Sequence, residues 1–218
     1  MSGLPVKTSD LIDRLATDLK PEPRNRLPRL IALGALGGAA VSGLVVGSLW
    51  GIRPDMAAAL RTPPFWIKEF FVLGLAAVGF LAVLSLARPA GKAGSPAFLA
   101  VAIASGLGAL AVLQLASAPP ELWKRLIMGK TSAVCPWLIM LLAIPVMLGL
   151  TWAMRRMAPT RLRAAGAMAG LTAGALSALI YSVSCDESAM PFVFVWYGGA
   201  IAAMAIVGAL MGPRLLRW

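Results

Sequence analysis

Six long stretches of the chain contain no charged residue, and they limit its possible folds more than any other feature. They cover residues 30–52, 70–87, 93–120, 131–154, 164–185 and 188–213. An α-helix rises about 1.5 Å per residue, so roughly 20 residues cross the 30 Å hydrocarbon core of a bilayer. Within lipid the backbone must satisfy its own hydrogen bonds, and a helix does so. The sequence therefore predicts an all-α membrane protein, a six-transmembrane-helix bundle with spans at about 30–52, 70–87, 96–117, 132–154, 164–185 and 190–212.

Lysine and arginine are distributed unevenly over the segments between these stretches. Segment 1–29, the loops 88–92 and 155–163 and the C-terminal tail together carry 14 of the 20 basic residues, and the three alternate loops carry 6. Because basic residues are retained on the cytoplasmic side of a membrane, this asymmetry predicts that both termini face the cytoplasm. The same rule accounts for the net charge of +11 without any direct binding to nucleic acid.

Residues 1–29 form the only sizeable segment outside the predicted spans, which leaves 30–218 as the transmembrane domain. A short cytoplasmic helix is predicted at about residues 10–20, because four apolar side chains would share one face. These four are Leu11, Ile12, Leu15 and Leu19. The opposite face is mixed and rich in acids, whereas helices that lie on a membrane surface usually have a basic polar face. The sequence therefore favours a protein partner for segment 1–29 over lipid.

Glycines recur four residues apart inside the predicted spans, a spacing that lets helices approach closely. The sets are Gly34/Gly38, Gly43/Gly47, Gly166/Gly170/Gly174 and Gly208/Gly212. They indicate a compact bundle. Packing within one chain and formation of a homo-oligomer both remain open.

Residues that usually perform chemistry are scarce. The chain has no histidine and the predicted spans contain no carboxylate, so neither an enzyme nor a bound cofactor is indicated. A metal site would have to draw on Cys135, Cys185, Asp186 and Glu187, which is a poor zinc-binding set. No metal site is predicted, although two thiols could hold a soft ion.

A transporter is the main alternative to a regulatory protein. Ion-coupled transporters usually keep ionisable groups inside the bundle, whereas every charged residue here is expected at a span boundary. Transport of a small solute or an ion is therefore disfavoured but stays open, as does a role as a subunit of a membrane complex.

The chain contains two cysteines, each near one end of an apolar stretch. Cys135 lies five residues after Lys130 and Cys185 directly precedes Asp186, and the predicted orientation places both at the outer face, where disulfides form and persist. Because the loop 155–163 is short, the fourth and fifth spans should be antiparallel neighbours, which allows the two residues to come within disulfide distance. The pair is predicted to be a redox or metal-responsive sensor, against the alternative of two packing residues. The neighbouring Asp186 is expected to disfavour the Cys185 thiolate.

Several segments also carry a family resemblance. They are Thr8 to Leu19 followed by prolines, Cys135 entering the fourth span with Pro145 further in, Cys185-Asp186-Glu187 followed by Pro191-Phe192 and Trp196-Tyr197, and the ending from Gly208 to Trp218. In these segments the chain resembles the NrsF family of bacterial inner-membrane anti-sigma factors. A histidine commonly precedes the second cysteine in that family, where this chain has Ser184, so no metal-binding role carries over to that position.

The resemblance implies a function that composition and spacing do not reach. It implies that the chain sequesters an extracytoplasmic-function sigma factor at the inner (cytoplasmic) membrane and releases it on oxidative or heavy-metal stress. The expected partners are then the sigma factor and the lipid bilayer. Leu11, Ile12, Leu15 and Leu19 would contact the sigma factor, and Cys135 and Cys185 would sense the stress.

Overall fold

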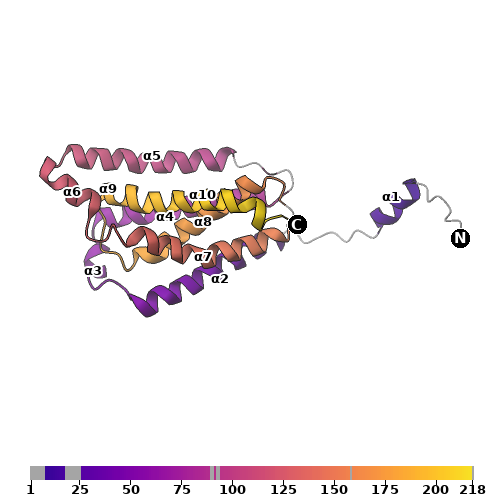
Figure 1. The fold of residues 1–218 in the computed structure, drawn as a ribbon, viewed down its shortest axis with the longest axis horizontal. Helices are drawn as coiled ribbons and strands as arrows, with labels where there is room; N and C mark the ends of the chain where they lie inside the picture. Colours follow the sequence, from indigo (N-terminus) through magenta and orange to yellow (C-terminus); the bar gives the residue numbers. More distant parts are fainter. Residues whose placement is uncertain (1–7, 18–25, 89–90, 92–93, 158, 218) are drawn as a thin grey trace.

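The computed structural model describes residues 8–17, 26–88, 91, 94–157 and 159–217. This part of the chain consists of helices and the turns between them (Figure 1). The helices are α1 (Thr8–Thr17), α2 (Arg26–Leu49), α3 (Met56–Ala59), α4 (Pro63–Leu86), α5 (Gly94–Ala116), α6 (Pro120–Met128), α7 (Cys135–Arg155), α8 (Leu162–Ser182), α9 (Met190–Phe192), the π-helical turn η1 (Val193–Tyr197) and α10 (Gly198–Leu215).

Six helical segments are long and apolar enough to cross a membrane. They are α2, α4, α5, α7, α8 and the continuous run Met190–Leu215. The predicted all-α, multi-pass architecture is therefore confirmed, and the chain is a multi-pass membrane protein.

The helix bounds differ most from the predicted spans at the first two. α2 begins at Arg26 rather than near residue 30, and α4 begins at Pro63 rather than near residue 70. A proline in the first turn of a helix has its φ angle already set and loses no hydrogen bond. Lysine and arginine can bury their alkyl chains along a helix, so a charged residue does not mark where the helix ends.

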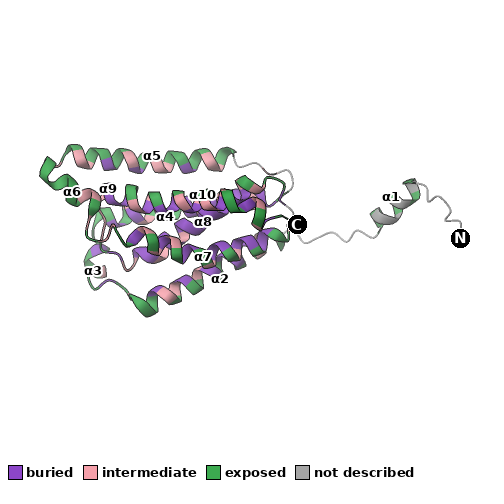
Figure 2. Cartoon of the chain, in the orientation of Figure 1, coloured by how far each residue is buried: buried purple, intermediate pink, exposed green. Residues whose placement is uncertain are grey.

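The central helix of the bundle is α8. It contacts α2, α4, α7 and α10, and every residue it buries is glycine, alanine, serine or threonine except Tyr181. Figure 2 shows the buried residues gathered along the helices that surround it. Small side chains allow four helices to pack around one, because without the bulk of larger residues the backbones come close together.

Two pairs of helices touch through their backbones. A Cβ atom on Gly166 of α8 would collide with the carbonyl oxygen of Gly208 on α10, and one on Gly34 of α2 with the carbonyl oxygen of Gly149 on α7. By contrast, a Cβ atom on Gly43 would meet nothing within 4 Å. The glycine spacing in these two pairs therefore serves packing within one chain.

At the edge of the bundle lies α5, which packs on α4 and on the α9–η1 segment. Only 17% of its apolar window is buried, and Figure 2 shows most of its surface exposed. Its outward side chains, such as Phe98 and Val112, are apolar and more than 60% exposed. Such a surface is suited to lipid and not to water.

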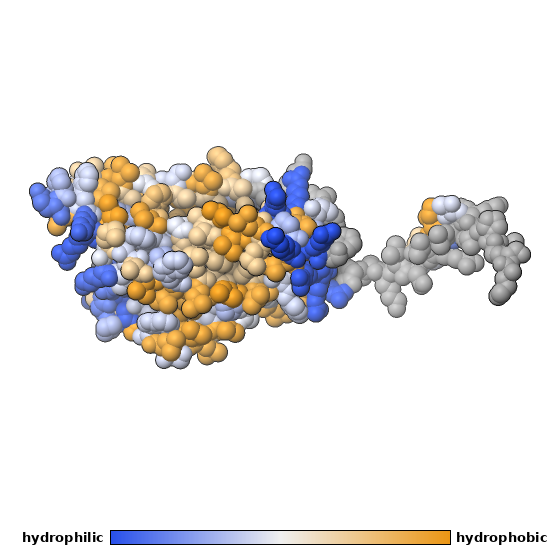
Figure 3. Space-filling model, in the orientation of Figure 1, coloured by the Kyte–Doolittle hydropathy of each residue, from blue (hydrophilic) through white to orange (hydrophobic). Residues whose placement is uncertain are grey.

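The bundle has two polar ends separated by an apolar band (Figure 3). We call one the cysteine end, which holds residues 51–69, 117–135 and 183–189. The other, the terminal end, holds the start of α2, the end of α4 up to residue 88, the loop after α7 with the start of α8, and the C-terminus of α10 (Figure 1). A charged residue in either end can reach water while the band between them faces hydrocarbon.

Candidate functional site

The two cysteines meet at the cysteine end of the bundle. Cys135 is the first residue of α7, and Cys185 lies in the segment that joins α8 to α9. Their sulfur atoms are 3.5 Å apart, and both side chains are buried, with 0% and 3% exposed. The thiols are free, so the site holds a reduced dithiol. The antiparallel packing of α7 on α8 brings together residues 50 positions apart, as the sequence predicts.

Hydroxyl groups surround the two sulfurs. The Cys135 thiol donates a hydrogen bond of 3.1 Å to Thr131 Oγ1 and lies 3.3 Å from the hydroxyl of Tyr181. Tyr197 is fully buried beside them, with its ring centroid 6.4 Å from that of Tyr181. The π-helical turn η1 carries Tyr197, and such turns are rare and often found at functional sites.

A buried lysine holds the segment that carries Cys185. Lys68 lies in the second turn of α4 and is fully buried. Its ammonium donates to the carbonyl oxygens of Glu187 at 3.1 Å, Cys185 at 3.3 Å and Ser182 at 3.5 Å. The last carbonyl groups of a helix lack partners within the helix and carry partial negative charge. Lys68 therefore caps the C-terminal end of α8 from a neighbouring helix.

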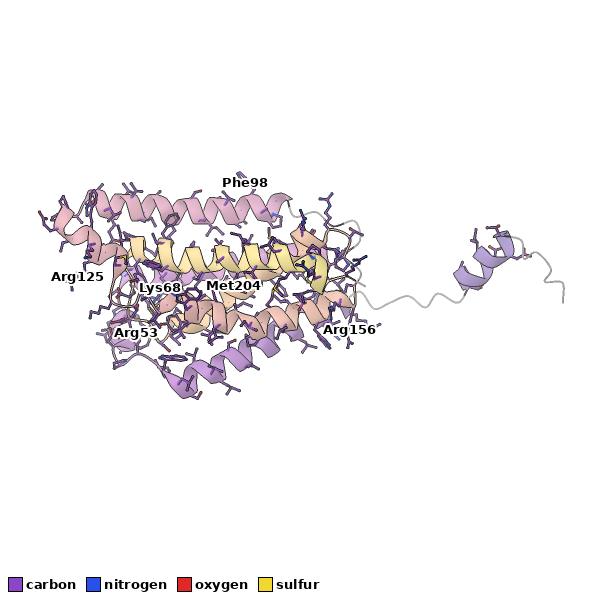
Figure 4. All side chains as sticks on the ribbon, in the orientation of Figure 1. Arg53, Lys68, Phe98, Arg125, Arg156 and Met204 are labelled. Carbon is purple, nitrogen blue, oxygen red and sulfur yellow. The ribbon has the colours of Figure 1, made fainter. Side chains whose placement is uncertain are left out.

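Arg53 is a second cation that contacts the backbone of the segment carrying Cys185. Its guanidinium donates to the carbonyl oxygen of Cys185 at 3.0 Å and makes a bidentate pair with Asp55, at 2.6 Å for each bond. This pair lowers the pKa of Asp55 and raises that of Arg53. Figure 4 shows Arg53 and Lys68 at the same end of the bundle, far from Arg156 at the terminal end. The carbonyl of Cys185 thus accepts from two positively charged groups.

These cations correct two expectations from the sequence. Lys68 and Glu69, expected at a boundary before the second span, lie within α4, where Lys68 is buried and Glu69 is half-buried. The Cys185 thiolate is favoured, not disfavoured. The hydrogen bond with Cys135, followed by those with Tyr197 and the Glu187 backbone and by the positive charge of Lys68, lowers the pKa of the Cys185 thiol to about 6, although burial acts to raise it. The hydrogen-bond donors and the cation outweigh the burial that would otherwise disfavour the thiolate.

A signal for Lys68 was present in the sequence. It precedes Phe71, Val72 and Leu75 by three, four and seven residues, which is the spacing of one helix face, and all three are buried. Lys68 is placed on this helix face only if the helix is taken to begin at Pro63 and not near residue 70. No comparable pattern marks Arg53, Thr131, Tyr181 or Tyr197, because each lies in a different helix or turn.

Within the described part of the chain, the dithiol is not part of a larger set of metal ligands. Among the residues that the structure describes, no three of the Cys, Asp and Glu side chains come together as they would around a metal ion. Glu187 is held elsewhere, since its Oε1 accepts from the backbone N–H of Lys130 at 2.6 Å. Two sulfurs alone can form a disulfide or share one soft ion.

Of the predicted contact stripe in the N-terminal segment, the structure describes the side chain of Ile12. Ile12 on α1 is 59% exposed. The side chains of Leu11 and Leu15, and all of Leu19, fall outside the described part of the chain. Because α2 begins at the terminal end, segment 1–25 joins the bundle at the end opposite the two thiols (Figure 1).

Comparison with known proteins gives one consistent result. The model of the NrsF family, described as negative regulator of sigma F, matches residues 15–218. A protein of Azospira oryzae named probable anti-sigma-F factor NrsF is 39% identical over 214 residues, covering 98% of this chain and 100% of the relative. The anti-sigma-F factor NrsF of Caulobacter vibrioides is 37% identical over 217 residues, with the same coverage of 98% and 100%. No solved structure matches the chain. The chain therefore belongs to the NrsF family of negative regulators of sigma F, and it is a regulator and not an enzyme.

Proposed function

We propose that this chain holds an extracytoplasmic-function sigma factor inactive at the bacterial inner membrane. In this proposal the N-terminal segment 1–29 binds the sigma factor in the cytoplasm. Oxidation of Cys135 and Cys185, or their binding of a soft metal ion, releases it. The observation that carries the proposal is the arrangement of the bundle, in which the dithiol and the start of α2 lie at opposite ends (Figure 1).

The exposure of Ile12, the one residue of the predicted stripe whose side chain the structure describes, supports α1 as the binding element. Ile12 has 59% of its surface exposed although it is a large apolar residue on a ten-residue helix. So short a helix is marginal in isolation, because nucleation is costly, and it gains stability when its apolar face is covered. Leu11, Ile12, Leu15 and Leu19 form the proposed contact, in which an amphipathic helix enters a groove on its partner.

The packing of α7 on α2 offers a physical route between the two ends. Cys135 starts α7, and this helix then runs along α2, with Gly149 against Gly34. The Ser42 hydroxyl of α2 donates to the carbonyl oxygen of Leu142 on α7 at 2.7 Å. Since close packing transmits small displacements, a shift of α7 on disulfide formation would move α2. The start of α2 connects directly to the proposed sigma-binding segment.

Co-purification tests the proposed partner directly. The tagged full-length protein is affinity-purified from membranes of the bacterium that naturally produces it. One small sigma factor should be recovered with it, in a molar amount comparable to that of the tagged protein. Recovery should fall after the cells are exposed to an oxidant. A truncated chain that begins at residue 26 should recover none, because it lacks the proposed contact. Equal recovery by the truncated chain would place the binding surface elsewhere.

The proposed orientation rests on where charges lie in the bundle. Among the described residues, the terminal end carries nine arginines and no acid, whereas the cysteine end carries six bases and five acids. Fluorescent-protein fusions after residues 90, 160 and 218 should therefore fluoresce as cytoplasmic proteins. A phosphatase fusion after residue 118, at the cysteine end, should be active outside the cytoplasm. Phosphatase activity of a fusion at residue 218 would show that the orientation is the opposite one, with the two thiols on the cytoplasmic side.

A further inference from the structure

We propose that the two thiols have different chemical roles, with Cys185 as the first to react, Cys135 as the resolving thiol, and Lys68 as the residue that positions and activates Cys185. This inference rests on the proposed function, because it describes how the same dithiol would be oxidised. Lys68 lies outside the segments that carry the family resemblance.

The cations select between the sulfurs. Lys68 and Arg53 both donate to the carbonyl oxygen of Cys185, at 3.3 and 3.0 Å, so two positive charges lie at this residue. A thiolate is the reactive form of cysteine, and nearby lysine or arginine favours it. The N-terminus of α7 also favours an anion, but the sulfurs are 3.5 Å apart, so its field reaches both. Lys68 and Arg53 contact the backbone of Cys185, and Lys68 interacts electrostatically more strongly with Cys185 than with Cys135.

Charge balance gives the same assignment. Lys68 is fully buried, and the three acceptors of its ammonium group are neutral carbonyl groups. A buried cation is costly unless an anion compensates it. Arg53 already pairs with Asp55, and Glu69, which accepts from the Ser182 hydroxyl at 3.0 Å, balances part of the charge of Lys68. A thiolate on Cys185 supplies a further negative charge beside Lys68.

Cys135 is suited to remain protonated until the second step. Its thiol proton has two acceptors within reach, Thr131 Oγ1 at 3.1 Å and the sulfur of Cys185 at 3.5 Å. When this single proton turns from Thr131 to the sulfur of Cys185, it stabilises an anion there. The charged and titratable groups around Cys185 are Lys68 and Glu69 on α4, Arg53 and Asp55 before it, Cys135 on α7, Tyr181 on α8, Tyr197 on η1, and Asp186 and Glu187 in its own segment.

A pocket large enough for a small oxidant lies beside the chain segments that lead to the two buried thiols. This pocket of about 420 Å³ at the cysteine end is lined by α6 and by Gly129, Lys130, Asp186 and Glu187. Lys130 and Asp186 are the chain neighbours of Thr131 and Cys185. The two chain segments are joined there by the hydrogen bond from the backbone N–H of Lys130 to Glu187 Oε1. Opening of this bond would bring the pocket to the sulfurs.

With a peroxide as oxidant the proposed steps balance. The Cys185 thiolate attacks one peroxide oxygen, so an S–O bond forms, the O–O bond breaks, and the leaving oxygen takes up a proton as water or an alcohol. The Cys135 thiol then attacks the sulfur of the Cys185 sulfenic acid. An S–S bond forms, the S–O bond breaks, and water leaves with the Cys135 proton. The dithiol loses two electrons and the peroxide gains two.

Differential modification of the full-length protein in detergent tests the assignment. With a small neutral thiol reagent, methyl methanethiosulfonate, Cys185 should be modified about tenfold faster than Cys135 at pH 7, as read by mass spectrometry. Its rate should rise with a midpoint near pH 6, because the pKa of Cys185 is lowered to about 6. With hydrogen peroxide and dimedone, the Cys135→Ser variant should trap a sulfenic acid on Cys185. The Cys185→Ser variant should trap at least tenfold less on Cys135.

Variants of Lys68 separate its charge from its structural contacts. Lys68→Met should raise the pH midpoint of Cys185 modification by at least one unit and slow the reaction about tenfold at pH 7. Lys68→Arg, which keeps the charge, should restore the midpoint, and Lys124→Met, an exposed lysine at the same end, should leave it unchanged. If Lys68→Met fails to fold, Lys68→Gln keeps a donor without the charge and replaces it. An unchanged midpoint in the uncharged variant, or faster reaction of Cys135, overturns the inference.

The outcomes of this test and of the proposed function are distinguishable. If the two thiols react alike but serine variants still lose the stress response in cells, only the division of roles is wrong. If Cys185 reacts first as expected but serine variants respond normally in cells, the chemistry stands and the sensing proposal fails.

Discussion

Leu15→Asp should abolish binding of the sigma factor. Leu15 is central in the proposed stripe of Leu11, Ile12, Leu15 and Leu19, so its side chain would be covered in the complex. Placing an unpaired carboxylate in an apolar groove costs on the order of 4 kcal/mol, which corresponds to about a thousandfold loss of affinity. Cells with this variant should express sigma-dependent genes at the level of a deletion strain. A reporter for such a gene and co-purification from membranes measure the two effects.

A matched charge on the other side of α1 serves as the control. Thr17 is exposed and lies nearly opposite Leu15 on the helix, two residues further along. Thr17→Asp introduces the same charge into the same short helix and should leave binding within about threefold of the parent, since an exposed charge costs little. Retention of the sigma factor by Leu15→Asp, or its equal loss in both variants, would contradict the proposed contact face.

Cys135→Ser and Cys185→Ser should each remove the response to oxidants. Serine is close in size and keeps a hydrogen-bonding group, but its oxygen cannot form a disulfide. Since the sulfurs are 3.5 Å apart and a disulfide needs both, either change removes the product. Induction of a sigma-dependent reporter by peroxide should fall to within about twofold of the uninduced level. Membrane levels of the protein, measured by immunoblot, should stay unchanged.

The double variant and the basal level add information to this test. If the two thiols act as one unit, the double variant should behave as each single variant does, which is the non-additive result expected of residues in contact. Repression in unstressed serine variants would mean that the modified form releases the sigma factor. Expression of the sigma-dependent genes in unstressed serine variants would mean that the reduced thiols are needed to hold the sigma factor. A normal response in both single variants would leave the cysteines as packing residues.

The position of Lys68 shows where reasoning from the sequence ends. A hydropathy scale assigns each residue its own free energy of transfer from water to lipid, without regard to its partners. A lysine just before the second charge-free stretch is therefore predicted to lie in a loop. In the structure the ammonium donates to three carbonyl groups of residues 182–187, more than 110 positions away. Those partners make the buried position possible, and no local pattern in the sequence specifies them.

The two cysteines show the converse. Between Cys135 and Cys185 lie two complete crossings of the membrane, and an even number of crossings returns the chain to the same side. Their common end follows from counting spans. Their 3.5 Å separation does not, because it depends on how α7 rotates and slides against α8. The glycine and alanine residues that set this packing are visible in the sequence, but their partners are not.

The sequence by itself determined that this chain crosses the membrane six times as helices, which ends carry the basic residues, and that both thiols lie at one end. Lipid offers no hydrogen bonds and tolerates few charges, so these properties depend on segment length and composition alone. Only the tertiary structure decided that Lys68 and Arg53 meet at the Cys185 carbonyl, that Tyr181 and Tyr197 lie beside the sulfurs, and that α7 packs on α2 toward the N-terminal segment. These contacts join residues that are far apart in the sequence. They depend on how the helices pack, because the position and the charge state of each side chain are set by the residues around it in the fold.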